Sequence, residues 1–271
     1  KAIVEKLKEF YSVETFEETG AEYNVKATLL KNRVTLTVDT SGVGLHKRGY
    51  RTSDVTAPIK ETLAAAMIQL SFWRDDRLLI DPCCGSGTIP IEAAMIGRNV
   101  APGINRHFAS EEWELIPEKL WQEERKSAFE AMDYDKELNI YGFDINMKAV
   151  EAARANAEEA GVDDCIVFKK ADARKLRPEG KNGIVITNPP YGERIGEKEE
   201  IEGIYAGFRK FFSENPDWSL FMITTDKEAE EKAMGRKAER RRKLYNGRLE
   251  TCYYQFHGKR IKTDADPEKE R

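Results

Sequence analysis

The four residues Asn188-Pro189-Pro190-Tyr191 stand directly after the apolar run 183–187. Two consecutive prolines remove two N–H donors and fix φ, so the chain can neither continue as a strand nor turn directly into a helix. An amide side chain, a carbonyl and an aromatic ring are therefore left together at the end of the strand. This is a stiff cradle suited to a planar group that carries an NH2 on its edge. Taken alone, the motif is also compatible with a proline-stopped strand and a surface tyrosine, although the cradle is the favoured interpretation.

A loop with two glycines, Asp81 to Thr88, follows an earlier apolar run and reads DPCCGSGT. Glycines there allow a tight turn and bring backbone N–H groups close to a ligand at the start of the following helix. The loop is not a P-loop, because no Gly-Lys-Ser/Thr follows, and it is not the dinucleotide G-x-G-x-x-G, because Pro90 fills the third glycine position. The Asp81 carboxylate would repel a pyrophosphate but can bind an ammonium group or an ordered water. The loop therefore favours a cationic ligand over NAD.

Two further acids follow later apolar runs. Asp144 ends the run 140–143 and suits bidentate hydrogen bonding to ribose hydroxyls. Asp172 can accept a hydrogen bond from an adenine NH2, and Ala173 leaves room for the ring. An acid at a strand end is, taken singly, more often a helix cap or a solvated turn. In the order glycine loop, ribose acid, adenine acid and Asn-Pro-Pro-Tyr, all of them fall where parallel strands present their carboxyl ends.

The elements that must position these residues alternate between strand and helix, which predicts a parallel sheet covered on both faces. The expected strands are 78–80, 140–143, 165–168, 184–187 and 220–223, and the expected helices are 58–70, 89–96, 147–160 and 201–212. Asn246-Gly247, the strongest short hairpin signal, separates two more strands, 242–245 and 249–256. The predicted fold class is α/β, with a mostly parallel seven-stranded sheet that ends in an antiparallel hairpin.

The first fifty residues have a different pattern. Residues 1–10 read as an amphipathic helix, and 25–30 and 34–38 alternate as strands. This helix and hairpin are too small to stand alone, so we expect them to belong to a larger module cut off at the N-terminus. Segment 110–137 is an expected insertion between the first core helix and the second core strand. The tail after Gly258 is polar and expected to be disordered.

The bulk composition narrows the class of protein. The chain has 271 residues, of which 40% are hydrophobic and 34% charged, with a net charge of −4. No stretch approaches the roughly 18 to 20 apolar residues of a membrane span, so no membrane partner is expected. The four cysteines form neither C-x-x-C nor a ligand-spaced cluster, which argues against a metal site and for a reducing cytoplasm. The basic run Lys232 to Lys243 reads as a solvated helix face more than as a nucleic-acid groove.

Together these motifs resemble the Rossmann-like, class I S-adenosylmethionine-dependent methyltransferases that modify exocyclic amines. The resemblance covers about residues 50 to 258 and implies S-adenosylmethionine as the cofactor. It assigns cofactor binding to the matching positions, which are Asp81, Cys83, Gly85, Gly87, Thr88, Asp144, Ile145, Asp172, Ala173 and Asn188. The catalytic positions that it implies are Asn188, Pro189, Pro190 and Tyr191.

The segment Asp39 to Arg51, which reads DTSGVGLHKRGYR, resembles the join between a THUMP RNA-binding domain and a catalytic domain. This join is typical of the bacterial THUMP-containing guanine-N2 methyltransferases of large-subunit (23S) ribosomal RNA, which have often been labelled N6-adenine-specific DNA methylases. The resemblance implies part of a THUMP domain and the connector at 1–50, the methyltransferase domain at 51–258 and a polar tail at 259–271. The candidate RNA-binding residues are His46, Lys47, Arg48 and Arg51, for which a solvated connector is the alternative.

The resulting hypothesis is a cytoplasmic enzyme that transfers a methyl group from S-adenosylmethionine to the exocyclic N2 amine of a guanine in 23S ribosomal RNA. The Asn188 side-chain oxygen and the Pro189 carbonyl would accept the two amine hydrogens and aim the nitrogen lone pair at the methyl group. Tyr191 would stack on the base. The alternatives are a tRNA guanine-N2 methyltransferase, an N6-adenine DNA methyltransferase and a non-catalytic RNA-binding assembly factor. The join at 39–51 argues against DNA, and the intact Asn-Pro-Pro-Tyr argues against a non-catalytic protein.

Overall fold

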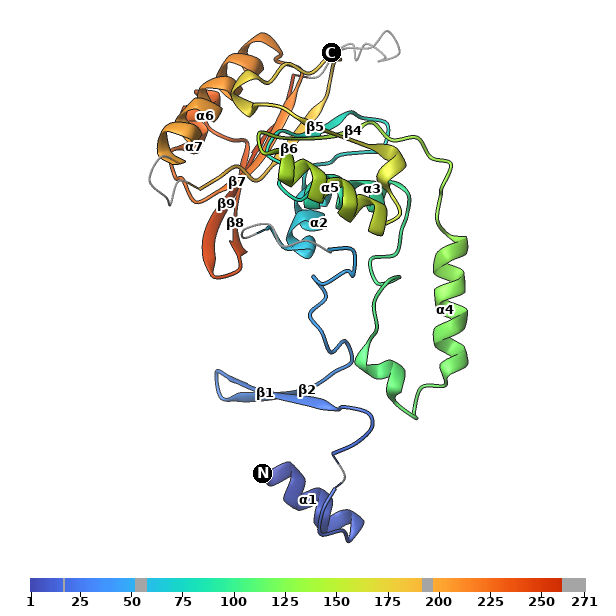
Figure 1. Ribbon diagram of the computed structural model, residues 1–271. Coiled ribbons are helices and arrows are strands. Elements are labelled where there is room, and N and C mark those ends of the chain that lie inside the picture. Colours follow the sequence, from blue (N-terminus) through green and yellow to red (C-terminus); the bar gives the residue numbers. More distant parts are fainter. Residues whose placement is uncertain (17, 52–57, 192–196, 260–271) are drawn as a thin grey trace, which may run out of the picture. The chain divides into compact units, whose positions relative to one another are not determined.

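The computed structural model describes residues 1–16, 18–51, 58–191 and 197–259 (Figure 1). The chain divides into two compact units. The smaller unit holds 1–44 and 107–125, and the larger unit holds 45–106 and 126–271. Apart from Lys259, the tail expected at 259–271 lies outside the described residues.

The larger unit is built on a seven-stranded sheet in the order β5-β4-β3-β6-β7-β9-β8. The first five strands in this order, which are β5, β4, β3, β6 and β7, pair in parallel. Strand β9 runs antiparallel to both β7 and β8. The strands are β3 (Leu79–Asp81), β4 (Ile140–Asp144), β5 (Ile166–Lys170), β6 (Ile184–Thr187), β7 (Ser219–Thr224), β8 (Arg240–Asn246) and β9 (Leu249–Phe256). The predicted α/β sheet with its terminal antiparallel hairpin is confirmed.

Helices cover both faces of this sheet (Figure 1). One apolar core joins the sheet to α2 (Glu61–Leu70), α3 (Thr88–Gly97) and α5 (Met147–Glu159). The other core joins it to α6 (Glu197–Glu214) and α7 (Ala229–Met234). Strands β6 and β7 are buried along their whole length between these layers. That is why their sequences, IVIT and SLFMIT, do not alternate between apolar and polar residues.

The smaller unit contains α1 (Ala2–Tyr11) and the antiparallel hairpin of β1 (Asn24–Leu30) and β2 (Arg33–Asp39). Both turn residues, Lys31 and Asn32, have positive φ, as a tight two-residue hairpin turn requires. No residue of α1, β1 or β2 is buried in the described structure. The larger N-terminal module therefore stays a prediction.

The insertion expected at 110–137 is shared between the two units. Its first part holds the short 3-10 helix η1 (Ala109–Glu112), and α4 (Glu118–Glu130) begins in the smaller unit. Within that unit the Trp113 indole N–H donates to the Glu22 carbonyl at 3.0 Å. The two remaining 3-10 helices, η2 (Asp163–Cys165) and η3 (Ala173–Lys175), flank β5 in the larger unit.

The interpretation of the basic run Lys232 to Lys243 as a helix face was wrong. Helix α7 ends at Met234, and Gly235 adopts a φ of 63° that turns the chain away. Arg240 to Lys243 instead lie on β8, one of the two edge strands of the sheet. Two of these cations have local carboxylate partners: Arg241 lies 2.5 Å from Glu230 and Lys243 lies 2.6 Å from Glu250.

The hairpin that ends the sheet turns one residue later than the Asn-Gly signal suggests. Asn246 pairs with Leu249, so the two turn residues are Gly247 and Arg248. Gly247 has a φ of 64°, which fits a hairpin turn whose first central residue is glycine. Asn246 is consequently the last residue of β8 and not part of the turn.

Candidate active site

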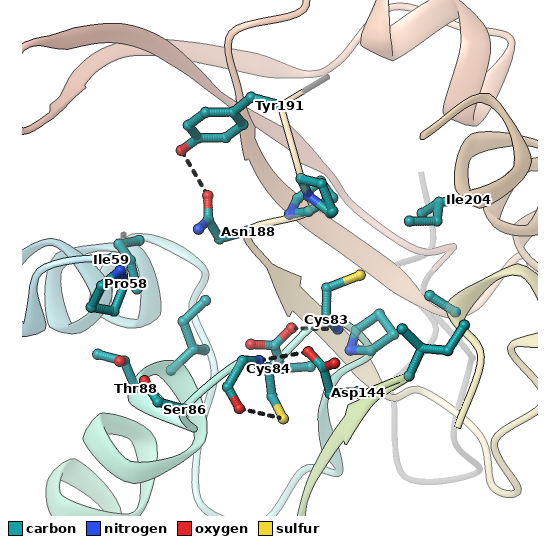
Figure 2. A pocket seen from close by; sticks show the side chains of 18 of the residues that line it. Pro58, Ile59, Cys83, Cys84, Ser86, Thr88, Asp144, Asn188, Tyr191 and Ile204 are labelled. Carbon is teal, nitrogen blue, oxygen red and sulfur yellow. Dashed lines mark hydrogen bonds between the residues drawn. The ribbon is translucent and has the colours of Figure 1, made fainter. Parts of the chain in front are cut away.

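A cavity of about 560 Å³ lies at the carboxyl ends of β3, β4 and β6 (Figure 2). This is the edge at which doubly wound sheets bind their ligands, and the volume is within the usual range for a small-molecule site. The cavity brings together every residue that the sequence predicts for catalysis or cofactor binding, with the exception of Gly87. The lining members of that set are Asp81, Cys83, Gly85, Thr88, Asp144, Ile145, Asp172, Ala173, Asn188, Pro189, Pro190 and Tyr191. Their individual functions stay predictions.

Gly85 and Gly87 of the loop both have positive φ, but the surroundings of the two residues differ. A Cβ on Gly87 would lie 2.9 Å from the Ala153 Cβ and 3.0 Å from the Phe168 ring, so Gly87 is needed for packing against α5 and β5. A Cβ on Gly85 would meet no atom within 4 Å. Gly85 therefore presents its backbone directly to the cavity.

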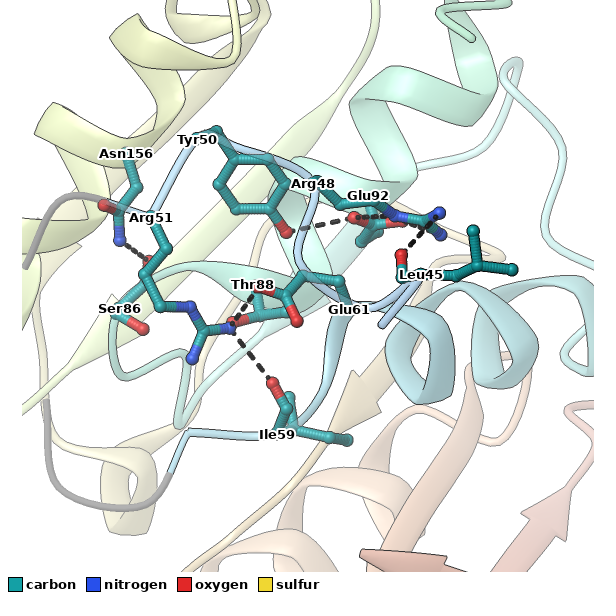
Figure 3. Close-up of polar contacts among 10 residues, drawn as sticks. All are labelled: Leu45, Arg48, Tyr50, Arg51, Ile59, Glu61, Ser86, Thr88, Glu92 and Asn156. Atoms are coloured by element: carbon teal, nitrogen blue, oxygen red, sulfur yellow. Dashed lines mark hydrogen bonds and ion pairs between the residues drawn. The ribbon is translucent and has the colours of Figure 1, made fainter. Parts of the chain in front are cut away.

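The Ser86 carbonyl and hydroxyl have contrasting environments. Asn156, buried on α5, donates its side-chain N–H to the Ser86 carbonyl at 3.0 Å and so holds the loop (Figure 3). The Ser86 hydroxyl is buried at the cavity wall without a hydrogen-bond partner among the described residues. A buried unsatisfied polar group costs about 1–3 kcal/mol.

Asp81 is a buried acid at the end of β3. The Thr187 hydroxyl donates to its Oδ1 at 2.8 Å, and the Cys83 backbone N–H donates to the same oxygen at 3.1 Å. Burial raises the pKa of Asp81 to about 7, and these two hydrogen bonds oppose the shift only in part. A cation placed in the cavity would favour the ionised form of this carboxyl.

Asp144 ties the glycine loop to β4. Its Oδ2 accepts a hydrogen bond from the Gly85 N–H at 3.0 Å, and its Oδ1 accepts one from the Asn146 N–H at 2.8 Å. Each carboxylate oxygen keeps a second acceptor site after these bonds. The carboxylate can therefore still accept hydrogen bonds from two neighbouring hydroxyls of a ligand.

Asp172 is held by the arginine two residues later. The Arg174 side chain donates to both carboxylate oxygens, with the closest contact at 2.7 Å, and the Arg174 N–H donates to Oδ1 at 3.0 Å. Hydrogen bonding from Arg174 lowers the pKa of Asp172. An adenine amine at Asp172 would have to share or displace the guanidinium, so this predicted contact needs Arg174 to adjust.

Asn188 and Tyr191 are hydrogen-bonded to each other across the cavity wall (Figure 2). The Tyr191 hydroxyl donates to the Asn188 Oδ1 at 2.7 Å. A second amide reaches the same hydroxyl, because the Asn246 Nδ2 donates to the Tyr191 oxygen at 3.3 Å. The Asn-Pro-Pro-Tyr motif is thus part of a three-residue hydrogen-bonded chain.

Several lining residues were not predicted from the sequence. They are Ile59, Pro82, Cys84, Ser86, Ile89, Arg174, Glu200, Ile204, Asn246 and Leu249. The adjacent residues in the glycine loop follow from its position, but Glu200 and Ile204 come from α6, and nothing local in that helix marks a site. Asn246 carried a signal that was interpreted only as a turn. Cys84 is a buried free thiol, and burial raises its pKa well above the usual value, so it stays protonated.

None of the four predicted RNA-binding residues lines the cavity, and two of them have internal partners. Arg48 lies 3.3 Å from Glu92 of α3, with side chains 11% and 2% exposed, and the Tyr50 hydroxyl donates to the same carboxylate at 3.0 Å (Figure 3). Burial raises the pKa of Glu92, while Arg48 opposes the shift. His46 is half-buried and Lys47 is exposed.

Arg51 connects the same segment to α2 and to the end of the glycine loop. Its guanidinium lies 3.1 Å from Glu61 and also donates to the Ile59 carbonyl and to the Thr88 hydroxyl, each at 3.1 Å. Removing one member of such a buried pair costs about 3–5 kcal/mol. Arg48 and Arg51 therefore hold α2 and α3 in place, a role that the sequence analysis missed, and RNA binding by these four residues stays a prediction.

Two negative findings apply to the described part of the chain. Within it, no group of three or more histidine, cysteine, aspartate or glutamate side chains is arranged to hold a metal ion. None of its helices is both long and apolar enough to cross a membrane.

Comparison with known proteins agrees with this geometry. Residues 48–255 match the UPF0020 family, which is described as an RMKL-like methyltransferase domain. The crystal structure of SMU.472 complexed with SAH is 45% identical and superposes with a TM-score of 0.88, covering 96% of this chain and 69% of that one. The fold is that of a Rossmann-like methyltransferase.

Curated protein sequences that are similar to this chain are also named as methyltransferases. The Bacillus subtilis (strain 168) protein named "Putative RNA methyltransferase YpsC" is 49% identical over 96% of this chain and 68% of its own length. The "Ribosomal RNA large subunit methyltransferase K/L" of Shewanella baltica (strain OS195) is 38% identical over 90% of this chain. The chain spans only 36% of that longer protein. It belongs to the family of RMKL-like methyltransferase domains.

Proposed function

We propose that this protein transfers a methyl group from S-adenosylmethionine to the exocyclic N2 amine of a guanine in large-subunit ribosomal RNA. One observation carries the proposal: a single cavity holds both the acids suited to a nucleoside cofactor and the Asn-Pro-Pro-Tyr cradle suited to a planar amine. A methyl donor and a base would thus lie side by side.

The residues of the cavity fit this cofactor. S-Adenosylmethionine supplies an electrophilic methyl group on a sulfonium when it is bound. Asp81 would provide a buried carboxylate for the positive charge of its methionine part, Asp144 would accept hydrogen bonds from its ribose hydroxyls, and Asp172 would accept one from its adenine amine. The open space above Gly85, where an added Cβ would meet no atom within 4 Å, is a further feature that a bound ligand would use.

The chain acts on the substrate amine by orientation. An aromatic NH2 is a poor nucleophile because its lone pair is delocalised into the ring. If the Asn188 Oδ1 and the Pro189 carbonyl accept its two hydrogens, the nitrogen pyramidalises and its lone pair turns towards the methyl group. As positive charge develops on nitrogen, the same acceptors stabilise it. The methylated amine would then release one of its two protons to solvent, which leaves a neutral product. The Tyr191 ring would fix the plane of the base.

The choice of RNA rests on the relatives and on the connector. One relative is named for large-subunit ribosomal RNA and another for RNA. The segment 39–51 also has the sequence expected beside an RNA-binding module. The base must leave its stack to reach the cavity, at a cost of a few kcal/mol that is smallest in an unpaired loop. We therefore expect the target guanine to lie in a single-stranded region of the RNA.

The test is tritiated methyl transfer from S-adenosylmethionine to ribosomal RNA, transfer RNA and DNA from a strain that lacks the gene, followed by nucleoside analysis. We expect label in large-subunit ribosomal RNA as N2-methylguanosine. Label recovered as N6-methyladenosine would refute the guanine assignment. Label confined to transfer RNA or to DNA would refute the ribosomal one.

Cofactor affinity should depend on pH through Asp81. Its pKa of about 7 in the free protein lies above the unfolded value. Between about pH 4 and 7 the folded state therefore keeps a proton that the unfolded state has lost, and the free protein loses stability as pH rises through this range. A cationic cofactor favours the ionised carboxyl. Its affinity should therefore fall as pH drops below 7, by at most about tenfold per pH unit, and level off above pH 8.

Calorimetry of S-adenosylhomocysteine binding between pH 5.5 and 8.5 measures this dependence, and buffers of different ionisation enthalpy report the proton released. Asp81→Asn is the matched control, because it keeps the shape of the side chain but cannot titrate. The variant should bind more weakly with a flat profile in this range. A flat profile in the unsubstituted protein would show that Asp81 does not face the charge.

A further inference from the structure

The β8–β9 hairpin forms part of the cavity wall through Asn246. Because the turn is formed by Gly247 and Arg248, Asn246 remains a strand residue, and it lines the cavity together with Leu249, its partner in register. The alternation along β8 puts Asn246 on the same side as Arg242 and Leu244, which are half-buried like Asn246, whereas Lys243 and Tyr245 are exposed. Its amide therefore points into the molecule at the level of the catalytic motif.

The amide of Asn246 contacts the motif through one atom. Its Nδ2 donates to the Tyr191 hydroxyl oxygen at 3.3 Å, and that hydroxyl donates to the Asn188 Oδ1 at 2.7 Å. A tyrosine hydroxyl has one proton to give. When a donor occupies its oxygen, the proton is directed to the remaining acceptor, and hydrogen bonds in such a chain strengthen one another.

We propose that Asn246 is a positioning residue for methyl transfer, which holds the Asn188 amide in its accepting orientation through the Tyr191 hydroxyl. The inference rests on the proposed function, in which the Asn188 Oδ1 must face the substrate amine. The Tyr191 hydroxyl occupies one acceptor site of that oxygen and leaves the second for the amine. Without this contact the Asn188 amide is free to rotate and can present its NH2 to the substrate, where it would repel the amine hydrogens.

The test compares three substitutions in the methyl-transfer assay. Asn246→Ala removes the donor, and Asn246→Asp keeps the shape of the side chain but replaces the donor by an acceptor that would compete for the Tyr191 proton. Tyr191→Phe keeps the ring but removes the hydroxyl. We expect each to lower kcat by about 3- to 30-fold, as the loss of one to two hydrogen bonds allows. The KM for RNA and the Kd for S-adenosylhomocysteine should change by less than about twofold.

A double-mutant cycle separates positioning from packing. The hydrogen-bonded chain from Asn246 through the Tyr191 hydroxyl to Asn188 is called the relay. In the Tyr191→Phe background, Asn246→Asp should cost no further activity, because the relay is already broken. Additive losses would overturn the proposal, and so would an Asn246→Asp variant with the activity of the unsubstituted protein. Glu250→Gln is the control on the same hairpin, since this side chain is exposed and pairs with Lys243.

A readout without substrate distinguishes failure of this inference from failure of the proposed function. The side-chain NH2 resonances of Asn188, assigned by comparison with Asn188→Asp, should shift in both Asn246→Asp and Tyr191→Phe and stay in place in Glu250→Gln. If the unsubstituted protein methylates no guanine but these shifts occur, the function is wrong and the relay is real. If the protein is active and the resonances do not move, the relay is wrong.

Discussion

Replacing Asn188 by alanine should lower kcat by about 10³-fold while changing the cofactor Kd by about twofold or less. The expected loss is comparable to that of removing one preorganised group that faces developing charge in a transition state. In the proposed function Asn188 contributes the side-chain acceptor opposite the substrate amine, whereas the glycine loop, Asp81 and Asp144, which lie at the ends of other strands in the same cavity, would bind the cofactor. Single-turnover methyl transfer and calorimetry with S-adenosylhomocysteine measure the two effects separately.

Asn188→Asp is the matched control for this prediction. A carboxylate has the same shape as the amide and accepts through either oxygen, so it should retain a substantial part of the activity that alanine loses. It would also accept the Tyr191 hydroxyl bond, now seen at 2.7 Å. If alanine abolished cofactor binding instead, Asn188 would serve the cofactor, the other role that the resemblance implies for it, and would not be the acceptor for the amine. If aspartate were as inactive as alanine, the amine would need the NH2 of the amide and not its oxygen.

The elements that carry the site could be predicted because their signals are local. A glycine loop after a short apolar run, an acid at the end of the next run and a proline pair after a third all mark ends of buried strands. Parallel pairing then brings those ends to one edge of the sheet. The structure places Asp81, Asp144 and Asn188 in one cavity for this reason.

The residues that were missed depend on partners far away in sequence. Arg48 and Arg51 read as exposed cations in a glycine-rich connector, but they pair with Glu92 and Glu61. One signal was available: Glu92 is a lone acid in the apolar helix Thr88–Gly97, and an isolated carboxylate on such a helix needs a cationic partner. Its sequence position could not identify which cation that would be.

Register is the other property that local sequence does not define. The Asn-Gly pair indicated a hairpin, and the hairpin exists, but pairing of Asn246 with Leu249 moves the turn on by one residue. A shift of one residue changes the face on which every strand side chain lies. It converts Asn246 from a turn residue into a cavity residue. Likewise, the basic residues Arg240 to Lys243 belong to β8 because they pair with β9, which no helical or strand propensity of the run itself could show.

Replacing Asp144 by alanine should produce the opposite pattern to Asn188→Ala, with the cofactor Kd raised at least about 100-fold and kcat at saturating cofactor changed little. Two charge-assisted hydrogen bonds to ribose hydroxyls are worth about 1.5–3 kcal/mol each, so losing both costs at least about 3 kcal/mol, which corresponds to a rise in Kd of somewhat more than about 100-fold. Loss of the bond that Asp144 accepts from Gly85, at 3.0 Å, loosens the loop and adds to the effect. Calorimetry and saturation kinetics give the two quantities.

A cofactor analogue locates the ribose contact independently of the loop. S-Adenosylhomocysteine lacking its 2′-hydroxyl should bind the unsubstituted protein more weakly, but it should bind Asp144→Ala about as tightly as the complete molecule does, because the shared hydrogen bond is already lost. Asp163→Asn, in the 3-10 helix before β5, is the matched acid control and should leave both affinities unchanged. Additive losses would mean that the 2′-hydroxyl is bound elsewhere and that Asp144 acts only through Gly85. An unchanged Kd for Asp144→Ala would remove this carboxylate from the cofactor site altogether.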